Sequence, residues 1–387
     1  MPLTRRIRIL QVLEATTGGT RKHLRLLLTH LDPSRFSVAL AYSNGRDARF
    51  ANDLQAFADR GIELHRAPMV REIRPGRDLA ALLRILRIVR RGGYDIVHAH
   101  SSKAGCLGRI AGWLAGTPAV VYSPHSFAFQ ENPRSLSGTC YRWIEKAAAR
   151  CQNRLLCVSA GEQKIAVELG IEREGRTCVI PNAIDASQYA PAGDRRQTRR
   201  AWDLPEEAPV IGVVAQFRRQ KGYDCLLQAV PRILRERPEA RFLVVGDGPL
   251  FPAVKKEIQS LGLQGRMALA GHHEDPTAFY HAMDVFVMCS RWEGMPYTIL
   301  EAMACGLPIV ATDTTGTNEL VRHGRNGYLA PVGQSETIAA RVVELLRDAP
   351  LRERFAQGSR EISQALPGIP DWIQRYESFY ASLVETN

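Results

Sequence analysis

Apolar runs of four to seven residues alternate with amphipathic stretches along both halves of the chain. In the first half, the runs cover residues 7–13, 37–42, 96–100, 119–123 and 155–159. The stretches between them have apolar residues at helical spacing, over residues 23–31, 47–60, 78–91 and 103–115. Uninterrupted apolar strands that alternate with helices are typical of a parallel sheet covered by helices on both faces. The pattern therefore predicts an α/β fold for the first half.

The second half repeats this pattern, with apolar runs at residues 210–216, 241–246, 267–270, 285–289 and 308–311. A length of 387 residues suits two domains better than one. We predict two Rossmann-like domains, residues 1–188 and 189–367, with a hinge at 179–191. Residues 368–387 are rich in aromatic residues at helical spacing, which predicts a terminal helix.

Composition indicates a globular protein, with 45% hydrophobic and 24% charged residues. No run of 18 apolar residues occurs, so we expect no transmembrane helix. The first ten residues are interrupted by Arg8 and lack a cleavage pattern, so we expect no signal peptide. The eight cysteines form no C-x-x-C pair, which predicts buried thiols in a reducing compartment rather than a zinc site or disulfides. A cytoplasmic location is expected.

The formal charge of +11 lies in the first half, where 28 Lys and Arg face 16 Asp and Glu between residues 1 and 189. Such a surface suits an anionic membrane, a phosphorylated substrate or nucleic acid. No helix-turn-helix, zinc-finger or RNA-binding signature accompanies it, so nucleic acid is not expected. Arg84, Arg87 and Arg91 share one face of a predicted helix, which favours peripheral contact with anionic lipid. A simple compositional bias toward arginine is the alternative.

The most informative segment begins at Glu293 and ends at Glu301, two carboxylates with seven residues between them. Proline suits the first turn of a helix, so Glu293 should precede that helix and Glu301 should lie inside it. Backbone N–H groups at a helix N-terminus bind phosphate. A ligand with both phosphate and hydroxyl groups, such as a nucleotide-sugar, fits this arrangement; a surface helix with two solvated glutamates is the alternative. The expected donor-binding residues here are Gly294, Met295, Pro296, Tyr297, Thr298 and Glu301.

This segment resembles the Glu-x7-Glu motif of the retaining glycosyltransferases of family 4, and the run that follows it, up to Ala311, also matches. The resemblance implies the GT-B fold: two Rossmann-like parallel-sheet domains facing a central cleft, and a C-terminal helix crossing back to the first domain. It implies transfer of a hexosyl group from a nucleotide-sugar, expected to be UDP-linked, with retention of configuration. It also implies that no metal or other cofactor is needed, in agreement with the absence of an Asp-x-Asp motif.

Cations and glycines after other strands of the second half extend the expected donor site. Arg218 and Lys221 follow a buried strand, where cations can neutralise a leaving diphosphate. Family members usually have the arginine earlier, and a solvated basic turn is the alternative reading. Gly246 and Gly248 resemble the family's Gly-x-Gly-Pro loop beneath the nucleotide.

Three loops of the first half are further candidates. Gly18 and Gly19 follow the first strand without the Gly-x-Gly-x-x-Gly spacing of dinucleotide enzymes, and they resemble the family's glycine loop beside the donor. His125 corresponds to the family histidine near the donor sugar, although Ser126 stands where glycine is common. Residues that end another strand are candidates for the acceptor side, because ligands bind there in parallel sheets: His100, Ser101 and Lys103.

Together these features predict a glycosyltransferase in which Glu293 binds sugar hydroxyls, Glu301 binds ribose hydroxyls and His125 orients the sugar. The resemblance to members that build bacterial surface polysaccharides implies a polyprenyl-diphosphate-linked saccharide as acceptor. A GT-B nucleotide-sugar epimerase and a nucleotide-sugar-binding regulator without turnover are the alternatives. The type of sugar and the linkage stay open.

Overall fold

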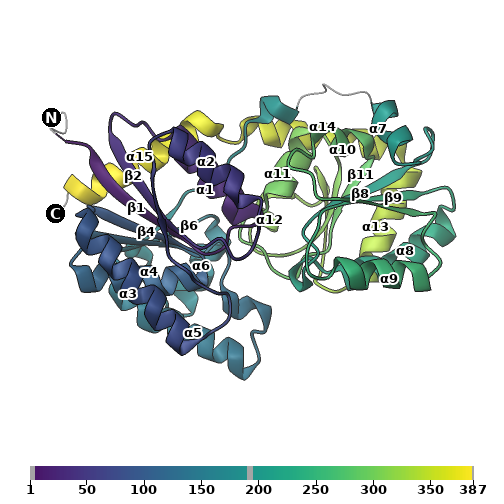
Figure 1. Ribbon diagram of the computed structural model, residues 1–387. Coiled ribbons are helices and arrows are strands. Elements are labelled where there is room, and N and C mark those ends of the chain that lie inside the picture. Colours follow the sequence, from purple (N-terminus) through teal and green to yellow (C-terminus); the bar gives the residue numbers. More distant parts are fainter. Residues whose placement is uncertain (1–4, 190–194, 386–387) are drawn as a thin grey trace. The chain divides into compact units, whose positions relative to one another are not determined.

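The computed structural model describes residues 5–189 and 195–385, which form two compact α/β units (Figure 1). Unit 1 comprises Met1–Asn182 and Pro370–Asn387, and unit 2 comprises Ala183–Ile369. Each unit contains one parallel sheet with helices on both faces, as the alternation of apolar runs and amphipathic stretches predicts. None of the helices within the described residues is long and apolar enough to span a membrane.

The sheet of unit 1 has the strand order β3-β2-β1-β4-β5-β6-β7. Its strands are β1 (Ile7–Leu13), β2 (Phe36–Tyr42), β3 (Glu63–Arg66), β4 (Ile96–His100), β5 (Ala119–Ser123), β6 (Arg154–Cys157) and β7 (Thr177–Val179). Its helices are α1 (Gly18–His30), α2 (Phe50–Asp59), α3 (Pro75–Gly92), α4 (Ser102–Ala115), α5 (Leu136–Ala148) and α6 (Ala160–Glu168). The order reverses between β1 and β4, and such a switch point opens a crevice at the carboxyl ends of the strands.

Local sequence explains where these elements begin and end. Every residue of β4 and β5 is buried, as expected for central strands of a sheet covered on both faces. Helix α3 begins with Pro75, whose fixed φ suits a first turn, and ends before Gly93, which takes the left-handed conformation at φ 55°. Helix α3 packs beside α4, and α4 packs beside α5.

The last helix, α15 (Ile369–Glu385), returns to unit 1, as the fold resemblance predicts. Its aromatic side chains Trp372, Tyr376 and Tyr380 are buried. The amide of Gln11 on β1 donates to the Tyr380 hydroxyl at 3.1 Å, and Glu377 forms an ion pair with Arg35 at 2.6 Å. The aromatic pattern of the terminal segment therefore reflects a buried face within unit 1.

The sheet of unit 2 has the order β10-β9-β8-β11-β12-β13, with a switch point between β8 and β11. Its strands are β8 (Val210–Val214), β9 (Arg241–Val245), β10 (Met267–Gly271), β11 (Val285–Met288), β12 (Ile309–Thr312) and β13 (Gly327–Ala330). Its helices are α7 (Arg195–Ala201), α8 (Tyr223–Glu236), α9 (Phe251–Ser260), α10 (Thr277–Ala282), α11 (Tyr297–Ala304), α12 (Thr317–Leu320), α13 (Ser335–Arg347) and α14 (Ala349–Ala365). Helix α8 packs beside α13, and α11 packs beside α14 (Figure 1).

The structure differs from the sequence-based expectations in some details. Strands β3, β7 and β13 were not predicted, because they have only three or four residues each and β3 is largely polar. Helix α1 already begins at Gly18 rather than at residue 23, and α5 was not predicted. The predicted hinge overlaps β7 at its start, and its last two residues, 190 and 191, lie outside the described residues.

Candidate active site

In unit 2, the functional candidates gather at the switch point of the sheet. The loop after β8 carries Arg218 and Lys221, and the loop after β11 carries Glu293 and leads into α11. Lys221 Nζ lies 2.5 Å from Glu293 Oε1, and the two side chains are 17% and 7% exposed. The amide of Gln220 donates to the Trp292 carbonyl oxygen at 2.9 Å, which ties the two loops together. Sequence analysis placed both charges in loops after strands; the structure shows that they pair.

Helix α11 begins at Tyr297, one residue after Pro296, which has an extended backbone with φ −75° and ψ 120°. Proline therefore precedes the helix rather than occupying its first turn. The N–H groups of the first turn of any α-helix have no carbonyl partner four residues back, so this end of α11 carries a partial positive charge beside Glu293. A phosphate group can bind there.

Glu301, the fifth residue of α11, is buried at the side of that helix. The Tyr280 hydroxyl donates to its Oε2 at 2.6 Å. Burial, followed by the charge of Glu301, raises the pKa of Tyr280 and of Tyr297 well above the ordinary value of 10, so both phenols keep their protons. Tyrosine thus holds the Glu301 carboxylate in position.

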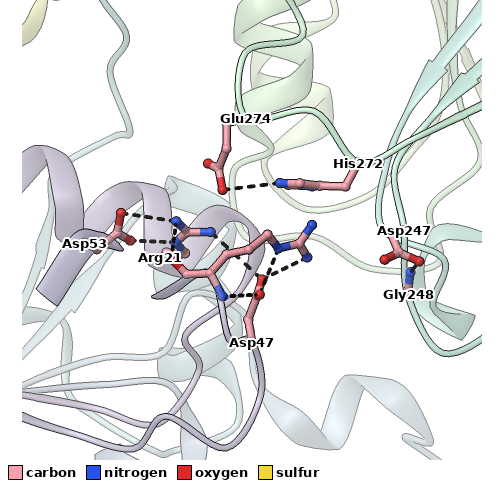
Figure 2. A network of polar contacts seen from close by, with 8 residues as sticks. Arg21, Asp47, Asp53, Asp247, Gly248, His272 and Glu274 are labelled. Carbon is pink, nitrogen blue, oxygen red and sulfur yellow. Dashed lines mark hydrogen bonds and ion pairs between the residues drawn. The ribbon is translucent and has the colours of Figure 1, made fainter. Parts of the chain in front are cut away.

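Glycines allow the loops of unit 2 to approach one another closely. Gly316, which precedes α12, has φ 72°, and a Cβ atom at this position would lie 1.8 Å from the carbonyl oxygen of Gly294. Gly246 follows β9, and its Cβ would lie 2.0 Å from the carbonyl oxygen of Ala215. In the next turn, Gly248 N–H donates to the Asp247 carboxylate at 2.7 Å (Figure 2). Arg218 is half-buried, and its backbone N–H donates to Gln216.

In unit 1, Gly18 and Gly19 were expected in a loop, but they are the first two residues of α1. Arg21 in the first turn of this helix is buried and forms an ion pair with Asp53 of α2 at 2.5 Å (Figure 2). Glu14, which follows β1, forms a second ion pair with Arg46. These ion pairs fix the start of α1 at the switch point of the first sheet.

A buried network of imidazoles lies at the carboxyl ends of β1, β4 and β5. His100 Nε2 lies 2.7 Å from the Gln11 side-chain oxygen, and His100 Nδ1 lies 3.0 Å from His125 Nε2. His98 bonds to the Tyr380 hydroxyl at 2.7 Å and to Ser123 Oγ at 2.9 Å. Burial, together with the neighbouring imidazoles, holds the pKa values of His98, His100 and His125 well below 6.5, so all three are neutral at pH 7. The network connects His125 to α15.

His125 is half-buried, whereas His98 and His100 are fully buried, so His125 is where this network reaches the surface of unit 1. His125 and Ser126 have φ values of 55° and 100°, a strained conformation for residues other than glycine. The Ser126 N–H donates at 2.6 Å to Glu162, a buried carboxylate that stabilises the turn. Strain that is held in place in this way is typical of functional loops.

The acceptor-side candidates lie where β4 leads into α4. Ser101 has φ 64°, and its buried hydroxyl has no hydrogen-bond partner among the described residues. Lys103 lies nearby in α4 and forms an ion pair with Asp78 of α3 at 2.7 Å. A buried hydroxyl without a partner is a donor or acceptor available to a ligand.

Sequence reasoning missed several members of this network. His23 bonds to Asn182 at 3.0 Å and to the Tyr376 hydroxyl at 3.2 Å. One nitrogen atom from each of three residues, His23, His100 and His125, lies within 4.8 Å of the other two, so these imidazoles could coordinate a transition metal. Both nitrogens of His23 already have partners, so a metal would have to displace one of them. The spacing of His23, four residues after Gly19, was the available signal in the sequence.

Comparisons with known proteins identify the family. Residues 18–183 match a family described as Glycosyl transferase 4-like domain, and residues 194–362 match Glycosyl transferases group 1. The UDP-Gal:alpha-D-GlcNAc-diphosphoundecaprenol alpha-1,3-galactosyltransferase of Escherichia coli is 34% identical over 278 residues, which are 70% of this chain and 71% of that protein. The chain belongs to the group 1 and 4-like glycosyltransferases.

Solved structures support the same fold for this glycosyltransferase. Anabaena HepE, solved in complex with UDP and glucose, has a TM-score of 0.82 at 22% identity, with 97% of this chain and 100% of that chain covered. Sucrose-phosphate synthase from Thermosynechococcus elongatus has a TM-score of 0.82 at 20% identity, with 99% and 100% covered. The expected GT-B fold and the expected enzyme class are therefore confirmed.

Mild acid should destabilise unit 1 of the glycosyltransferase. Burial lowers the pKa of His23 to about 4 and those of His98 and His100 well below 6.5. The unfolded chain binds these protons near pH 6.5 and the folded chain does not. The contribution of these histidines to the free energy of unfolding is therefore fully present above about pH 6.5. Below that pH, each histidine lowers the free energy of unfolding by about 1.4 kcal/mol per pH unit, until the pH reaches the pKa of that histidine in the folded protein.

Denaturant unfolding at a series of pH values measures this slope. The His23→Gln variant should lose stability less steeply with acid than the wild type, whereas His30→Asn, at an exposed histidine of α1, should keep the wild-type slope. Equal slopes for all three proteins would contradict the neutral, buried state of His23.

Proposed function

We propose that this glycosyltransferase moves a hexosyl group from a UDP-sugar to a hydroxyl of a lipid-linked saccharide, with retention of anomeric configuration, in surface polysaccharide biosynthesis. The observation that carries the proposal is the Lys221–Glu293 pair beside the N-terminus of α11. This pair places a cation, a helix N-terminus and a carboxylate at one switch point of the sheet. The cation and the helix N-terminus suit a diphosphate, and the carboxylate suits hydroxyl groups of the same ligand.

In unit 2, the cationic residues would bind the diphosphate and the carboxylates would bind hydroxyl groups. Arg218, Lys221 and the N-terminus of α11 would stabilise the charge that develops on the leaving UDP. Glu293 would bind sugar hydroxyls, and Glu301 would bind the ribose. The GT-B structures of HepE contain UDP, UDP-glucose or UDP with glucose, which supports a UDP-sugar as donor.

The residues of unit 1 would serve the sugar and the acceptor. His125 would orient the donor sugar, and its neutral imidazole can accept or donate a hydrogen bond. His100, Ser101 and Lys103 would lie on the acceptor side. The E. coli relative is named for an acceptor on diphosphoundecaprenol, and a Rhizobium meliloti relative, 33% identical over 54% of this chain and 58% of its own, is named for lipopolysaccharide core biosynthesis. Both names support a lipid-linked saccharide as acceptor.

An acceptor of that kind would place the enzyme at the inner face of the cytoplasmic membrane. Arg84, Arg87 and Arg91 are exposed on α3, and each basic residue near an anionic lipid surface contributes about 1 kcal/mol of attraction. We therefore propose peripheral membrane contact through unit 1.

The proposal is tested by incubating the purified enzyme with a panel of UDP-sugars and polyprenyl-diphosphate-linked saccharides. One UDP-sugar should release UDP only when an acceptor is present, and proton NMR of the product should show the same anomeric configuration as in the donor. Lack of turnover and of UDP binding by calorimetry would reject the donor site, and an inverted product would reject retention.

We expect that turnover needs no metal, because cations of the chain and a helix dipole can carry the diphosphate charge. EDTA should change the rate less than about twofold. A rate abolished by EDTA and restored by Mn²⁺ or Mg²⁺ would contradict this. A rate restored only by Zn²⁺ would instead indicate the three imidazoles of His23, His100 and His125.

A further inference from the structure

Helix α5 exposes four of its apolar side chains to solvent. Leu136, Cys140, Trp143 and Ala147 are spaced four, three and four residues apart, so they form one stripe along the helix, and all four are exposed. Leu136 is 92% exposed and Trp143 is 69% exposed. We call these four residues the α5 stripe. An apolar stripe at helical spacing normally faces the core of a domain, and here it does not.

The opposite face of α5 explains how the helix is held. Glu145 is buried, accepts from Arg109 of α4 at 2.6 Å and accepts from the Tyr122 hydroxyl at 2.9 Å. Gly138 packs so tightly that a Cβ atom would lie 2.1 Å from the Asn132 carbonyl oxygen. The inner side of α5 is thus formed by Gly138, Glu145 and Ala148, with Tyr141 packed against the core, which leaves the α5 stripe on the outer side of the helix.

The neighbouring helix adds to the exposed apolar surface. Near the C-terminus of α4, which packs against α5, Trp113 is 60% exposed and Leu114 is 43% exposed. Exposed tryptophan and leucine together mark an interaction surface more often than a solvated one, and tryptophan favours the interface between water and lipid.

Charge indicates which partner covers this surface. Helices α3, α4 and α5 contain nine basic residues and two acidic ones, Asp78 and Glu145. Both acids are paired, with Lys103 and Arg109 respectively, which leaves seven basic residues without a carboxylate among the described residues. Arg134 and Arg150, just outside the two ends of α5, are also exposed. An apolar stripe on a helix that itself carries Arg142 and Lys146, with Arg134 and Arg150 at its ends, complements the anionic interface of a bilayer.

We propose that the α5 stripe inserts into the interfacial layer of an anionic membrane, with Trp143 and Leu136 as its main apolar anchors. The inference rests on the proposed lipid-linked acceptor, and it assigns the membrane contact to α5 and α4 as well as to the arginines of α3. Helix α5 begins eleven residues after His125, so the chain leads from the imidazole network directly to the inserted helix. An acceptor anchored in the same membrane would be presented to unit 1 at that point.

Vesicle co-sedimentation at low salt and at about 1 M salt separates insertion from electrostatic attraction, because the Debye length falls to about 3 Å at 1 M. The wild type should keep measurable binding to anionic vesicles at high salt. A Leu136→Ser/Trp143→Ser variant should bind at least about tenfold more weakly at high salt. Leu261→Ser, at an exposed leucine of unit 2, is the matched control and should bind like the wild type.

The outcomes separate this inference from the proposed function. UDP affinity measured by calorimetry, and turnover on a soluble, lipid-free acceptor saccharide, should be the same in the double variant as in the wild type. A wild type that neither binds UDP nor turns over this acceptor would reject the proposed function, but not the insertion. High-salt binding that is equal in the wild type and the double variant would overturn the inference. A wild type that binds no vesicles, but forms dimers that the double variant does not, would show that the stripe contacts a second copy and would also overturn it.

Discussion

The Glu293→Gln variant is expected to turn over at least about 100-fold more slowly than the wild type. Glutamine keeps the shape of the side chain and removes the charge that pairs with Lys221 at 2.5 Å. Loss of one charged contact at a site where charge develops costs about 3–4 kcal/mol of transition-state stabilisation. Steady-state turnover with saturating donor measures this loss, and calorimetry with UDP shows whether donor binding survives.

A control and a double variant make the test specific. Arg291 and Asp224 form a second ion pair between the same two segments, but Asp224 is 56% exposed, so Asp224→Asn should leave turnover within about twofold. Glu293→Gln combined with Lys221→Met should be slower than either single variant, because Lys221 would contact the diphosphate and Glu293 the sugar hydroxyls, so each change removes a different contact with the donor. Turnover of Glu293→Gln close to that of the wild type would reject the site.

The Gly316→Ala variant should lose donor binding and much of the stability of unit 2. The new Cβ would lie 1.8 Å from the Gly294 carbonyl oxygen, which precedes the N-terminus of α11, so this loop must move or the residue must leave its φ of 72°. Positive φ alone costs alanine about 1 kcal/mol, and the overlap should bring the loss in unfolding free energy to at least about 3 kcal/mol.

The Gly324→Ala variant separates the cost of a positive φ from the cost of the steric overlap. Gly324 has a similar φ of 78°, but no atom within 4 Å would meet its Cβ. This control should lose only about 1 kcal/mol and should bind UDP normally. Denaturant unfolding and calorimetry measure both effects, and equal losses in the two variants would show that the approach of Gly316 to Gly294 is unimportant.

Periodicity and strand-end motifs were enough to predict the central strands and the loops that carry the donor-site candidates. Long apolar strands such as β1 and β8 are visible in the sequence because both of their faces are buried. The edge strand β3 contains Glu63, His65 and Arg66, so its pairing with β2 depends on the sheet and not on its own composition. Helix α5 was missed for a related reason, since its apolar stripe does not mark a core-facing side.

The pairings within the site could not be predicted in the same way. Lys221 and Glu293 lie 72 residues apart, and their contact depends on β8 and β11 being neighbours. Gln11 and Tyr380 lie 369 residues apart, and their hydrogen bond depends on the return of α15 to unit 1. A motif places a residue at the end of a strand, whereas strand order decides which residues meet.

The return of α15 also affects how the chain folds during synthesis. Trp372, Tyr376 and Tyr380 complete the interior of unit 1, yet they leave the ribosome only after all of unit 2 has been made. We therefore expect the general tendency of N-terminal domains to fold first to be weaker in this chain. Until α15 emerges, Gln11 and His98 lack the Tyr380 hydroxyl that both of them contact, so we expect unit 1 to complete its fold only after unit 2 has been synthesised.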